Sequence, residues 1–304
     1  MIDLEGIEGM STETRNDRTM ELDAMPLSDL LRVMNDEDSR VAGAVREELP
    51  HIEEAVRRIV ASFKAGGRLI YMGAGTSGRL GILDAAECVP TFGVPPSMVV
   101  GLIAGGKGAL TKAVEGAEDN CGLGAQDLER IGLEPRDSVV GIAASGRTPY
   151  VLGGLDYARK VGAITVAVSC NKDSLVSKAA DVAIEVVPGP EVLTGSTRLK
   201  AGTAQKLVLN MISTASMVGI GKVYKNLMVD VVATNNKLKV RAENIVMTAA
   251  EVGRETARKA LAEAEGSCKA ATVMLLLSCG KTEAARKLQA AEGHVRKAVE
   301  RRAE

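Results

Sequence analysis

The sequence predicts an α/β fold in which a parallel sheet carries helices on both faces, followed by a small all-helical subdomain. Three observations lead to this prediction. Five short apolar runs alternate with segments of helical character between residues 69 and 218, the pattern of a parallel sheet covered by helices. Two of these runs end in glycine-rich loops. Beyond about residue 242 only helical patterns remain, dominated by Ala, Glu, Lys and Arg.

The N-terminal part precedes the first strand. About 25 polar residues without a clear period predict an extended arm. Ser28 is then expected to cap a short helix, because apolar residues at helical spacing follow it. From 38 to 64 apolar residues again recur at helical spacing, which predicts one helix that ends at the Gly66-Gly67 pair.

The sheet elements follow in order. Strands are predicted at 69–72, 97–103, 138–143, 164–168 and 182–187. Helices are predicted from Ser77 onward, over 107–119, from Pro149 to Gly162, and over 197–218. Proline suits the first turn of a helix and glycine the residue after its end. In the C-terminal subdomain, Gly266 and Gly280 are expected to separate helices.

Composition excludes several classes of partner. The 38 basic and 39 acidic residues leave a net charge of −1, so no overall field attracts nucleic acid or a membrane. Aromatic residues make up only 2%, which argues against base stacking. The longest apolar run, 270–279, is about half the length of a membrane span. No nucleic acid and no membrane partner is expected.

Cysteine usage and the N-terminus indicate the compartment. The five cysteines are odd in number and contain no C-x-x-C pair, which favours reduced thiols in a cytoplasmic protein. The N-terminus is acidic from its third residue, unlike a signal peptide. Only His51 and His294 are present, so the chain is poor in metal ligands and no metal is expected.

Two glycine-rich, hydroxyl-bearing loops are the main candidate for a binding site. They are Gly73-Ala-Gly-Thr-Ser-Gly78 and Ala144-Ser-Gly-Arg-Thr148, and each follows a predicted strand. Backbone N–H groups in such turns can approach an anion closely, and hydroxyls add further donors. Both loops fall at the carboxyl ends of strands, where ligands bind in such sheets. The loops therefore predict a phosphate site; tight connections without a ligand are the alternative.

The residues expected to bind the ligand follow from loop position. Gly75 and Gly146 would give backbone access, and the hydroxyl donors would be Thr76, Ser77, Ser145 and Thr148. A monophosphate is small, so the remaining hydroxyls could bind a polyol such as a sugar. A third hydroxyl-rich run, 194–200, adds Ser196 and Lys200 as candidates for that end of the ligand. For Lys200, a surface charge at the start of a helix stays open as an alternative.

Nucleotide cofactors fit poorly. Gly73-x-Gly75-x-x-Gly78 matches the dinucleotide fingerprint, but that site also needs a carboxylate at the end of the second strand. The second strand here ends in Ile-Ala-Gly, without a carboxylate, and no lysine follows the loop as in a P-loop. No cofactor is expected.

The pairing of Gly-x-Gly-Thr-Ser-Gly with Ser-Gly-Arg-Thr resembles the sugar isomerase domain, a five-stranded αβα sandwich that binds phosphosugars. Longer blocks resemble the family of N-acetylmuramic acid 6-phosphate etherases; they lie at 12–16, 35–38, 71–87, 113–119, 141–150, 194–206 and 226–235. The resemblance covers nearly the whole chain. It implies a division into an N-terminal arm with helices (1–53), a phosphosugar-binding domain (54–222) and a helical C-terminal subdomain (240–304).

The resemblance implies a carbon–oxygen lyase of cell-wall sugar recycling that removes D-lactate from the phosphosugar without a metal or redox cofactor. It assigns proton donation to Glu87 and the second acid/base role to Glu118. Partial burial is expected to raise the pKa of the glutamate that must be protonated. A solvated surface glutamate is the alternative for each position. A non-catalytic phosphosugar-binding regulator and an aldose–ketose isomerase remain alternatives for the protein.

The spacing of Glu87 from the first loop bears on assembly. An unbroken helix from Ser77 to Glu87 would separate them by about 15 Å along its axis, more than the length of a ring-form phosphosugar. Either Gly81 interrupts the helix or the site is shared between subunits. The resemblance favours a homodimer with a shared active site.

Overall fold

The computed structural model describes residues 10–112, 114–232 and 236–300. The chain divides into two compact units. The first comprises Met1–Ala85 and Ser97–Ser213, and the second comprises Ala86–Pro96 and Thr214–Glu304.

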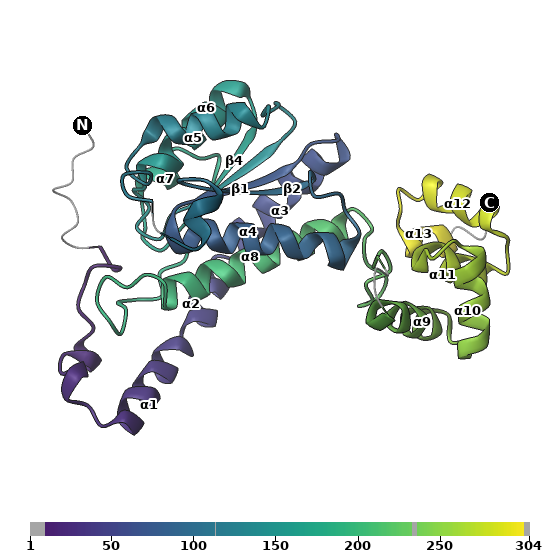
Figure 1. The fold of residues 1–304 in the computed structure, drawn as a ribbon, viewed down its shortest axis with the longest axis horizontal. Helices are drawn as coiled ribbons and strands as arrows, with labels where there is room; N and C mark the ends of the chain where they lie inside the picture. Colours follow the sequence, from purple (N-terminus) through teal and green to yellow (C-terminus); the bar gives the residue numbers. More distant parts are fainter. Residues whose placement is uncertain (1–9, 113, 233–235, 301–304) are drawn as a thin grey trace. The chain divides into compact units, whose positions relative to one another are not determined.

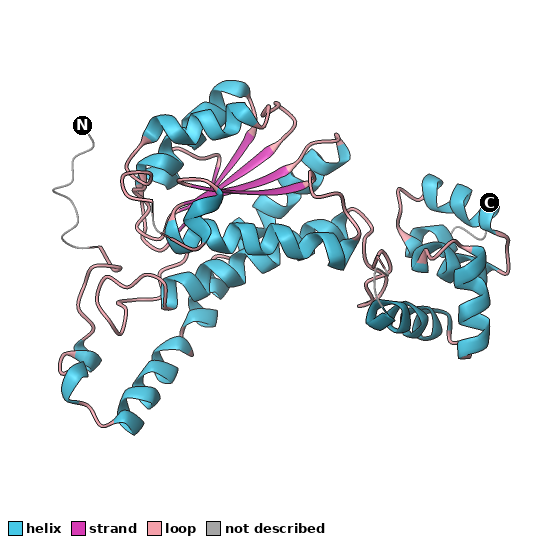
Figure 2. Ribbon diagram, viewed as in Figure 1, coloured by secondary structure: helices cyan, strands magenta, loops and turns pink. Residues whose placement is uncertain are grey.

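The first unit contains a five-stranded parallel sheet (Figures 1 and 2). Its strands are β1 (Leu69–Gly73), β2 (Val99–Ile103), β3 (Ser138–Ile142), β4 (Ile164–Ser169) and β5 (Val182–Glu185), in the order β2-β1-β3-β4-β5. All five predicted strands are confirmed, with ends that differ by at most two residues. Every residue of β1 and β3 is buried, because helices cover both faces of the sheet.

Helices cover the sheet as the fold class predicts. The helices before the C-terminal ones are α1 (Leu27–Asp38), α2 (Val41–Glu47), α3 (Leu49–Lys64), α4 (Gly75–Phe92), α5 (Cys121–Arg130), α6 (Pro149–Val161), α7 (Leu175–Lys178) and α8 (Lys200–Gly219). Of these, α1 extends away from the sheet (Figure 1). On one face, Ile70 and Met72 of β1 share an apolar cluster with Leu128 of α5 and Leu155 of α6. Figure 1 shows α4 and α8 on the opposite face.

Two helix predictions need correction, and one helix is present that the sequence analysis does not predict. The helix predicted over 38–64 is two helices, because Pro50 lacks the N–H that a continuous helix would need, and the chain turns at Glu48. The helix predicted over 107–119 is wrong: among its described residues, 107–112 and 114–119, only the 3-10 turn Lys107–Leu110 forms. A helix begins instead at Cys121, where the Asn120 side chain accepts from the N–H of Leu123.

Smaller differences concern helix starts and the arm. α1 begins at Leu27 with Pro26 at its cap, so Ser28 is not the cap. α8 begins at Lys200, three residues after the predicted start. The arm contains two 3-10 turns, Asp17–Thr19 and Leu22–Ala24, and its first nine residues lie outside the described part.

The second unit contains the predicted C-terminal helices. They are α9 (Asn236–Ala250), α10 (Arg254–Glu263), α11 (Cys268–Leu277), α12 (Lys281–Ala290) and α13 (Val295–Glu300). Their small apolar core is rich in alanine, and Gly266 and Gly280 fall between helices as predicted. Among the described residues, no helix combines the length and apolar character needed to cross a membrane.

Candidate functional site

The two glycine loops meet at one edge of the sheet. β1 and β3 are neighbours, and Gly73 at the end of β1 lies in register with Ile142 at the end of β3. Because the strands are parallel, the loops that follow them leave the sheet side by side. The structure thus brings together the two halves of the predicted phosphate site.

The first loop passes directly into α4, which begins at Gly75. A Cβ on Gly78 would lie 2.6 Å from the carbonyl oxygen of Gly73, so only glycine allows helix and strand to approach this closely. Gly75 is exposed and has a positive φ of 52°. Thr76 is half-buried. Ser77 is buried, and its hydroxyl donates to Oε1 of Gln205 in α8 at 3.0 Å.

The second loop is held against the loop that follows β4. Gly146 has a φ of 74°, and a Cβ there would lie 2.3 Å from Cβ of Ser174. Ser145 is half-buried, and its hydroxyl oxygen accepts from the N–H of Arg147 at 3.3 Å. Thr148 is buried and lies immediately before α6, which begins at Pro149 as predicted.

Glu118 contacts this second loop. Its carboxylate accepts a hydrogen bond from the Thr148 hydroxyl at 3.2 Å, and its carbonyl oxygen accepts from the N–H of Tyr150 at 2.9 Å. The Glu118 residue is otherwise exposed. A titratable carboxylate therefore lies beside the predicted phosphate loop, at a position that the sequence singled out.

Glu87 lies on the exposed surface of α4. The helix is continuous from Gly75 to Phe92, so Gly81 does not interrupt it. Gly81 instead allows α4 to pack on β1, since a Cβ there would lie 2.8 Å from Cβ of Tyr71. Glu87 is thus about 15 Å along the helix axis from Ser77. Both predicted catalytic glutamates are exposed in the single chain, so the expected partial burial is not present in it.

The third hydroxyl-rich run, 194–200, lies in the turn before α8 and at its first residue. Ser196 is half-buried in the turn before α8. Lys200, the first residue of α8, is only 1% exposed, and its ammonium donates to Oε2 of Glu37 at 2.6 Å. Glu37 is thus the partner of the Lys200 ammonium in the single chain, and its burial shows that the alternative of a surface charge is wrong. The substrate contact of Lys200 stays a prediction.

Glu191 caps the start of α8. Its carboxylate accepts the backbone N–H groups of Lys200 and Ala201, each at 2.9 Å. Burial raises the pKa of this carboxyl above its usual range, although these hydrogen bonds oppose the shift. The Glu191 carboxylate thus satisfies two N–H groups that the start of α8 leaves without a partner inside the helix.

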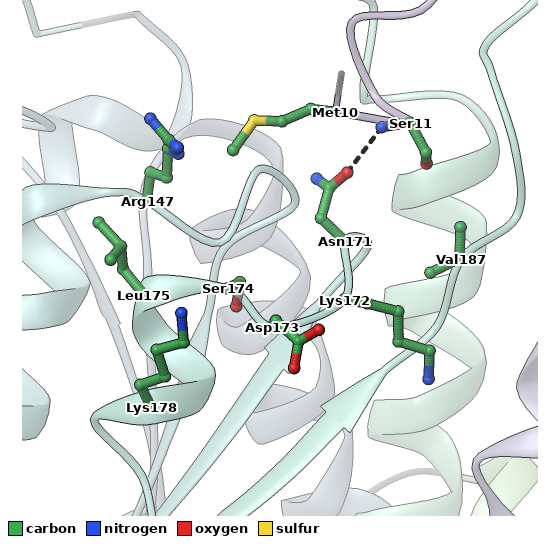
Figure 3. Close-up of a pocket in the computed structure, with 10 residues that line it drawn as sticks. All are labelled: Met10, Ser11, Arg147, Asn171, Lys172, Asp173, Ser174, Leu175, Lys178 and Val187. Atoms are coloured by element: carbon green, nitrogen blue, oxygen red, sulfur yellow. Dashed lines mark hydrogen bonds between the residues drawn. The ribbon is translucent and has the colours of Figure 1, made fainter. Parts of the chain in front are cut away.

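A pocket of about 510 Å³ lies beside the second loop (Figure 3). Residues from four segments line it: Met10, Ser11, Arg147, Asn171, Lys172, Asp173, Ser174, Leu175, Lys178 and Val187. The sequence analysis assigns none of these residues a role in binding, although Arg147 lies in the second glycine loop. The available signal was the position of Asn171 just after a strand, because ligands in such sheets lie at the carboxyl ends of the strands.

The described residues contain no group of three or more His, Cys, Asp or Glu residues that could hold a metal ion. Hydroxyls, backbone groups and carboxylates are the chemical groups that the two loops offer. Such a set can bind a phosphate and move protons next to it.

Comparisons with known proteins gave consistent matches. Residues 51–159 match the model of the glucokinase regulatory protein N-terminal SIS domain, and residues 129–215 match that of the SIS domain. N-acetylmuramic acid 6-phosphate etherase from Geobacillus sp. (strain WCH70) is 62% identical over 97% of this chain and 100% of the relative. N-acetylmuramic acid 6-phosphate etherase 2 from Lactiplantibacillus plantarum is 62% identical over 96% of this chain and 99% of the relative. Among solved structures, the phosphoheptose isomerase GmhA from Neisseria gonorrhoeae matches with a TM-score of 0.48 and 16% identity, covering 63% of this chain and 98% of that chain.

Proposed function

Because the chain belongs to the N-acetylmuramic acid 6-phosphate etherase family, we propose that it converts N-acetylmuramic acid 6-phosphate into N-acetylglucosamine 6-phosphate and D-lactate. The observation that carries this proposal in the structure is the Glu118 carboxylate, which is hydrogen-bonded to Thr148 in the second glycine loop. An acid/base group thus lies beside an anion-binding loop. Since the relatives bear etherase names, a non-catalytic regulator is not favoured.

The chemistry follows from the stability of the ether bond. An alkoxide is a poor leaving group, so direct displacement at the ether is slow. Opening of the sugar ring places an aldehyde next to C2, which makes the C2 proton acidic. A base removes this proton, the C3–O bond breaks, and an acid protonates the departing lactate oxygen. Water then adds at C3 and a proton returns to C2, so the net change is hydrolysis.

The two loops would hold the 6-phosphate. Ser145 is a suitable donor because its oxygen already accepts from Arg147, which leaves its own hydrogen for an anion. The exposed backbone of Gly75 and the half-buried Thr76 would supply donors from the first loop. Ser77 and Thr148 donate to Gln205 and Glu118, so we assign them a supporting role.

We assign the acid/base roles to Glu87 and Glu118 by family resemblance. The unbroken α4 supports a site that is shared between two copies of the chain, because the spacing between Ser77 and Glu87 exceeds the length of a ring-form phosphosugar. In a homodimer, Glu87 of one subunit would serve the loops of the other. Contact with substrate and with the second copy would then provide the burial that the single chain lacks. The cysteines form no disulfide, which suits the cytoplasmic location that we propose.

D-lactate release from N-acetylmuramic acid 6-phosphate tests the proposed function. The purified protein is expected to release one D-lactate per substrate. Glu118→Gln is expected to reduce the rate about 100-fold or more, because general acid–base catalysis contributes on that scale. Glu115→Gln is the matched control, since it alters an exposed neighbour and should leave the rate unchanged. Absence of D-lactate with the unaltered protein would refute the function.

A further inference from the structure

Asn171 lies two residues after β4 and is only 6% exposed. Because β4 pairs with β3, the loop that contains Asn171 leaves the sheet next to the second glycine loop. The Asn171 side chain donates from Nδ2 to the carbonyl oxygens of Ala144 and Ser145, each at 3.3 Å. A buried amide therefore connects this loop to the loop that we assign to the phosphate.

Backbone N–H groups of the segment 170–176 also donate to carbonyls of the second glycine loop. The N–H of Cys170 donates to the carbonyl of Ala144 at 2.9 Å, and the N–H of Val176 donates to that of Gly146 at 3.0 Å. Together with Asn171, they fix the carbonyls of three successive residues of the second glycine loop. The carbonyls of this loop thus face the segment 170–176.

The orientation of these carbonyls determines where the loop's N–H groups point. The described residues contain no cis peptide bond, and across a trans peptide the C=O of one residue and the N–H of the next point in opposite directions. The N–H groups that follow the fixed carbonyls therefore point away from the segment 170–176. Two of them have partners within the loop: the Gly146 N–H donates to the carbonyl of Ala143 at 3.0 Å, and the Arg147 N–H donates to the Ser145 hydroxyl oxygen at 3.3 Å. The carbonyl contacts thus orient the backbone N–H groups of the loop, with that of Ser145 pointing away from the segment 170–176.

The same amide also binds the N-terminal arm. The N–H of Ser11 donates to Oδ1 of Asn171 at 2.9 Å, which Figure 3 shows as a dashed line. Nδ2 of Asn171 donates to the hydroxyl of Thr12 at 3.2 Å, and Thr12 is only 2% exposed. The Ser11 hydroxyl donates to the carbonyl of Cys170 at 3.4 Å. Asn171 thus connects the arm to the glycine loop across about 160 residues of sequence.

We propose that Asn171 is a positioning residue for the phosphate loop and that the arm, through Ser11 and Thr12, contributes to phosphate affinity. This inference rests on the proposed function only in that the loop binds the 6-phosphate. It assigns no role in proton transfer to Asn171. Loss of the amide should therefore weaken binding and leave the chemical step nearly intact.

The test compares three variants. Asn171→Leu keeps the approximate size of the side chain and removes every hydrogen bond of the amide. Thr12→Val removes only the hydrogen bond between Nδ2 of Asn171 and the Thr12 hydroxyl and keeps the bond from the Ser11 N–H. Asp137→Asn is the control for general destabilisation, because buried Asp137 binds Arg68 where β1 and β3 begin, at the edge of the sheet opposite to the glycine loops.

KM and kcat are measured for N-acetylmuramic acid 6-phosphate, and the dissociation constant of inorganic phosphate is measured by calorimetry. For Asn171→Leu, KM and the phosphate dissociation constant should both rise about tenfold, with little change in kcat. Tenfold corresponds to about 1.4 kcal/mol, the size expected for the loss of these hydrogen bonds. Thr12→Val should raise both constants about threefold. Asp137→Asn should change neither.

Unchanged phosphate affinity in Asn171→Leu would overturn the positioning role. An equal loss of affinity in Asp137→Asn would also overturn it, because the effect would then reflect stability. If Asn171→Leu does not fold, Thr12→Val decides: unchanged phosphate affinity in that variant would refute the contribution of the arm. The calorimetric measurement of phosphate binding needs no turnover. If the unaltered protein binds phosphate but releases no D-lactate, that result would refute the proposed function and leave the positioning role standing.

Discussion

The buried ion pair between Glu37 and Lys200 gives an asymmetric prediction for stability. The Lys200 ammonium is 2.6 Å from Glu37, and both side chains are at most 2% exposed. Glu37 also contacts Arg18 at 2.9 Å and Arg40 at 3.2 Å. Burial alone would raise the pKa of Glu37, but the hydrogen bonds from Lys200, Arg18 and Asn16 outweigh it and lower the pKa. The carboxylate has several cationic partners, whereas the Lys200 ammonium donates to Glu37 and interacts with the Glu191 carboxylate only through its charge.

The two single substitutions should therefore differ in cost. Glu37→Gln leaves a buried ammonium without its carboxylate, which costs about 3 to 5 kcal/mol of unfolding free energy. Lys200→Met keeps the apolar stem and leaves Glu37 with two arginines, so we expect a loss of about 1.5 to 3 kcal/mol. The double variant should lose less than the sum, with a coupling energy of about 1 to 3 kcal/mol.

Urea unfolding followed by tyrosine fluorescence measures these differences, since Tyr71, Tyr150 and Tyr157 lie in the first unit. A larger loss for Lys200→Met than for Glu37→Gln, or strict additivity, would refute the reasoning. KM of Lys200→Met gives an independent check. A raised KM in the folded Lys200→Met variant would support the substrate contact that the sequence predicts for Lys200.

Three further predictions concern the loop, the opposite sheet edge and the assembly. Gly146→Ala should lose about 2 to 4 kcal/mol of unfolding free energy, because its Cβ would lie 2.3 Å from Cβ of Ser174 at a positive φ. Gly132→Ala, the control, has a positive φ but nothing within 4 Å, so it should lose only about 1 kcal/mol. Equal losses in urea unfolding would contradict the packing argument. Burial alone would raise the pKa of Asp137, but the hydrogen bonds from Arg68 and two backbone N–H groups lower it. This stabilisation is present above the unfolded-state pKa of about 3.9 and is lost as the pH falls through the lower folded pKa. Below about pH 4, the urea midpoint should therefore decrease less with falling pH in Asp137→Asn than in the unaltered protein. Parallel curves for the two proteins would contradict this. Mixing inactive Glu87→Ala and Glu118→Ala subunits should restore about a quarter of the activity if the site is shared in a randomly exchanging dimer, whereas no recovery after demonstrated exchange would contradict a shared site.

Features set by local sequence were predictable. Each strand is a short apolar run bounded by glycine, proline or polar residues, so all five were found. The two glycine loops were identified because close strand-to-helix turns need glycine at Gly78 and Gly146. The helix predicted over 107–119 failed because Gly116 takes a positive φ and Asn120 caps a later helix. The break at Glu48 could have been predicted from Pro50.

Features set by distant partners were not predictable. A lysine at a helix start is usually exposed, and the burial of Lys200 depends on Glu37, 163 positions away. A single Asn after a strand carries no signal for the arm residues that contact Asn171. For Glu118 the sequence identified the residue, but the hydrogen bond from Thr148 became visible only in the fold.

The most direct test of the account is the fate of solvent oxygen during turnover. The protein is incubated with N-acetylmuramic acid 6-phosphate in water enriched in heavy oxygen, and NMR isotope shifts distinguish C3 of the sugar from the exchanging C1. Elimination followed by water addition predicts heavy oxygen at C3 of N-acetylglucosamine 6-phosphate and none in D-lactate. Heavy oxygen in D-lactate, with an unlabelled C3, would contradict elimination.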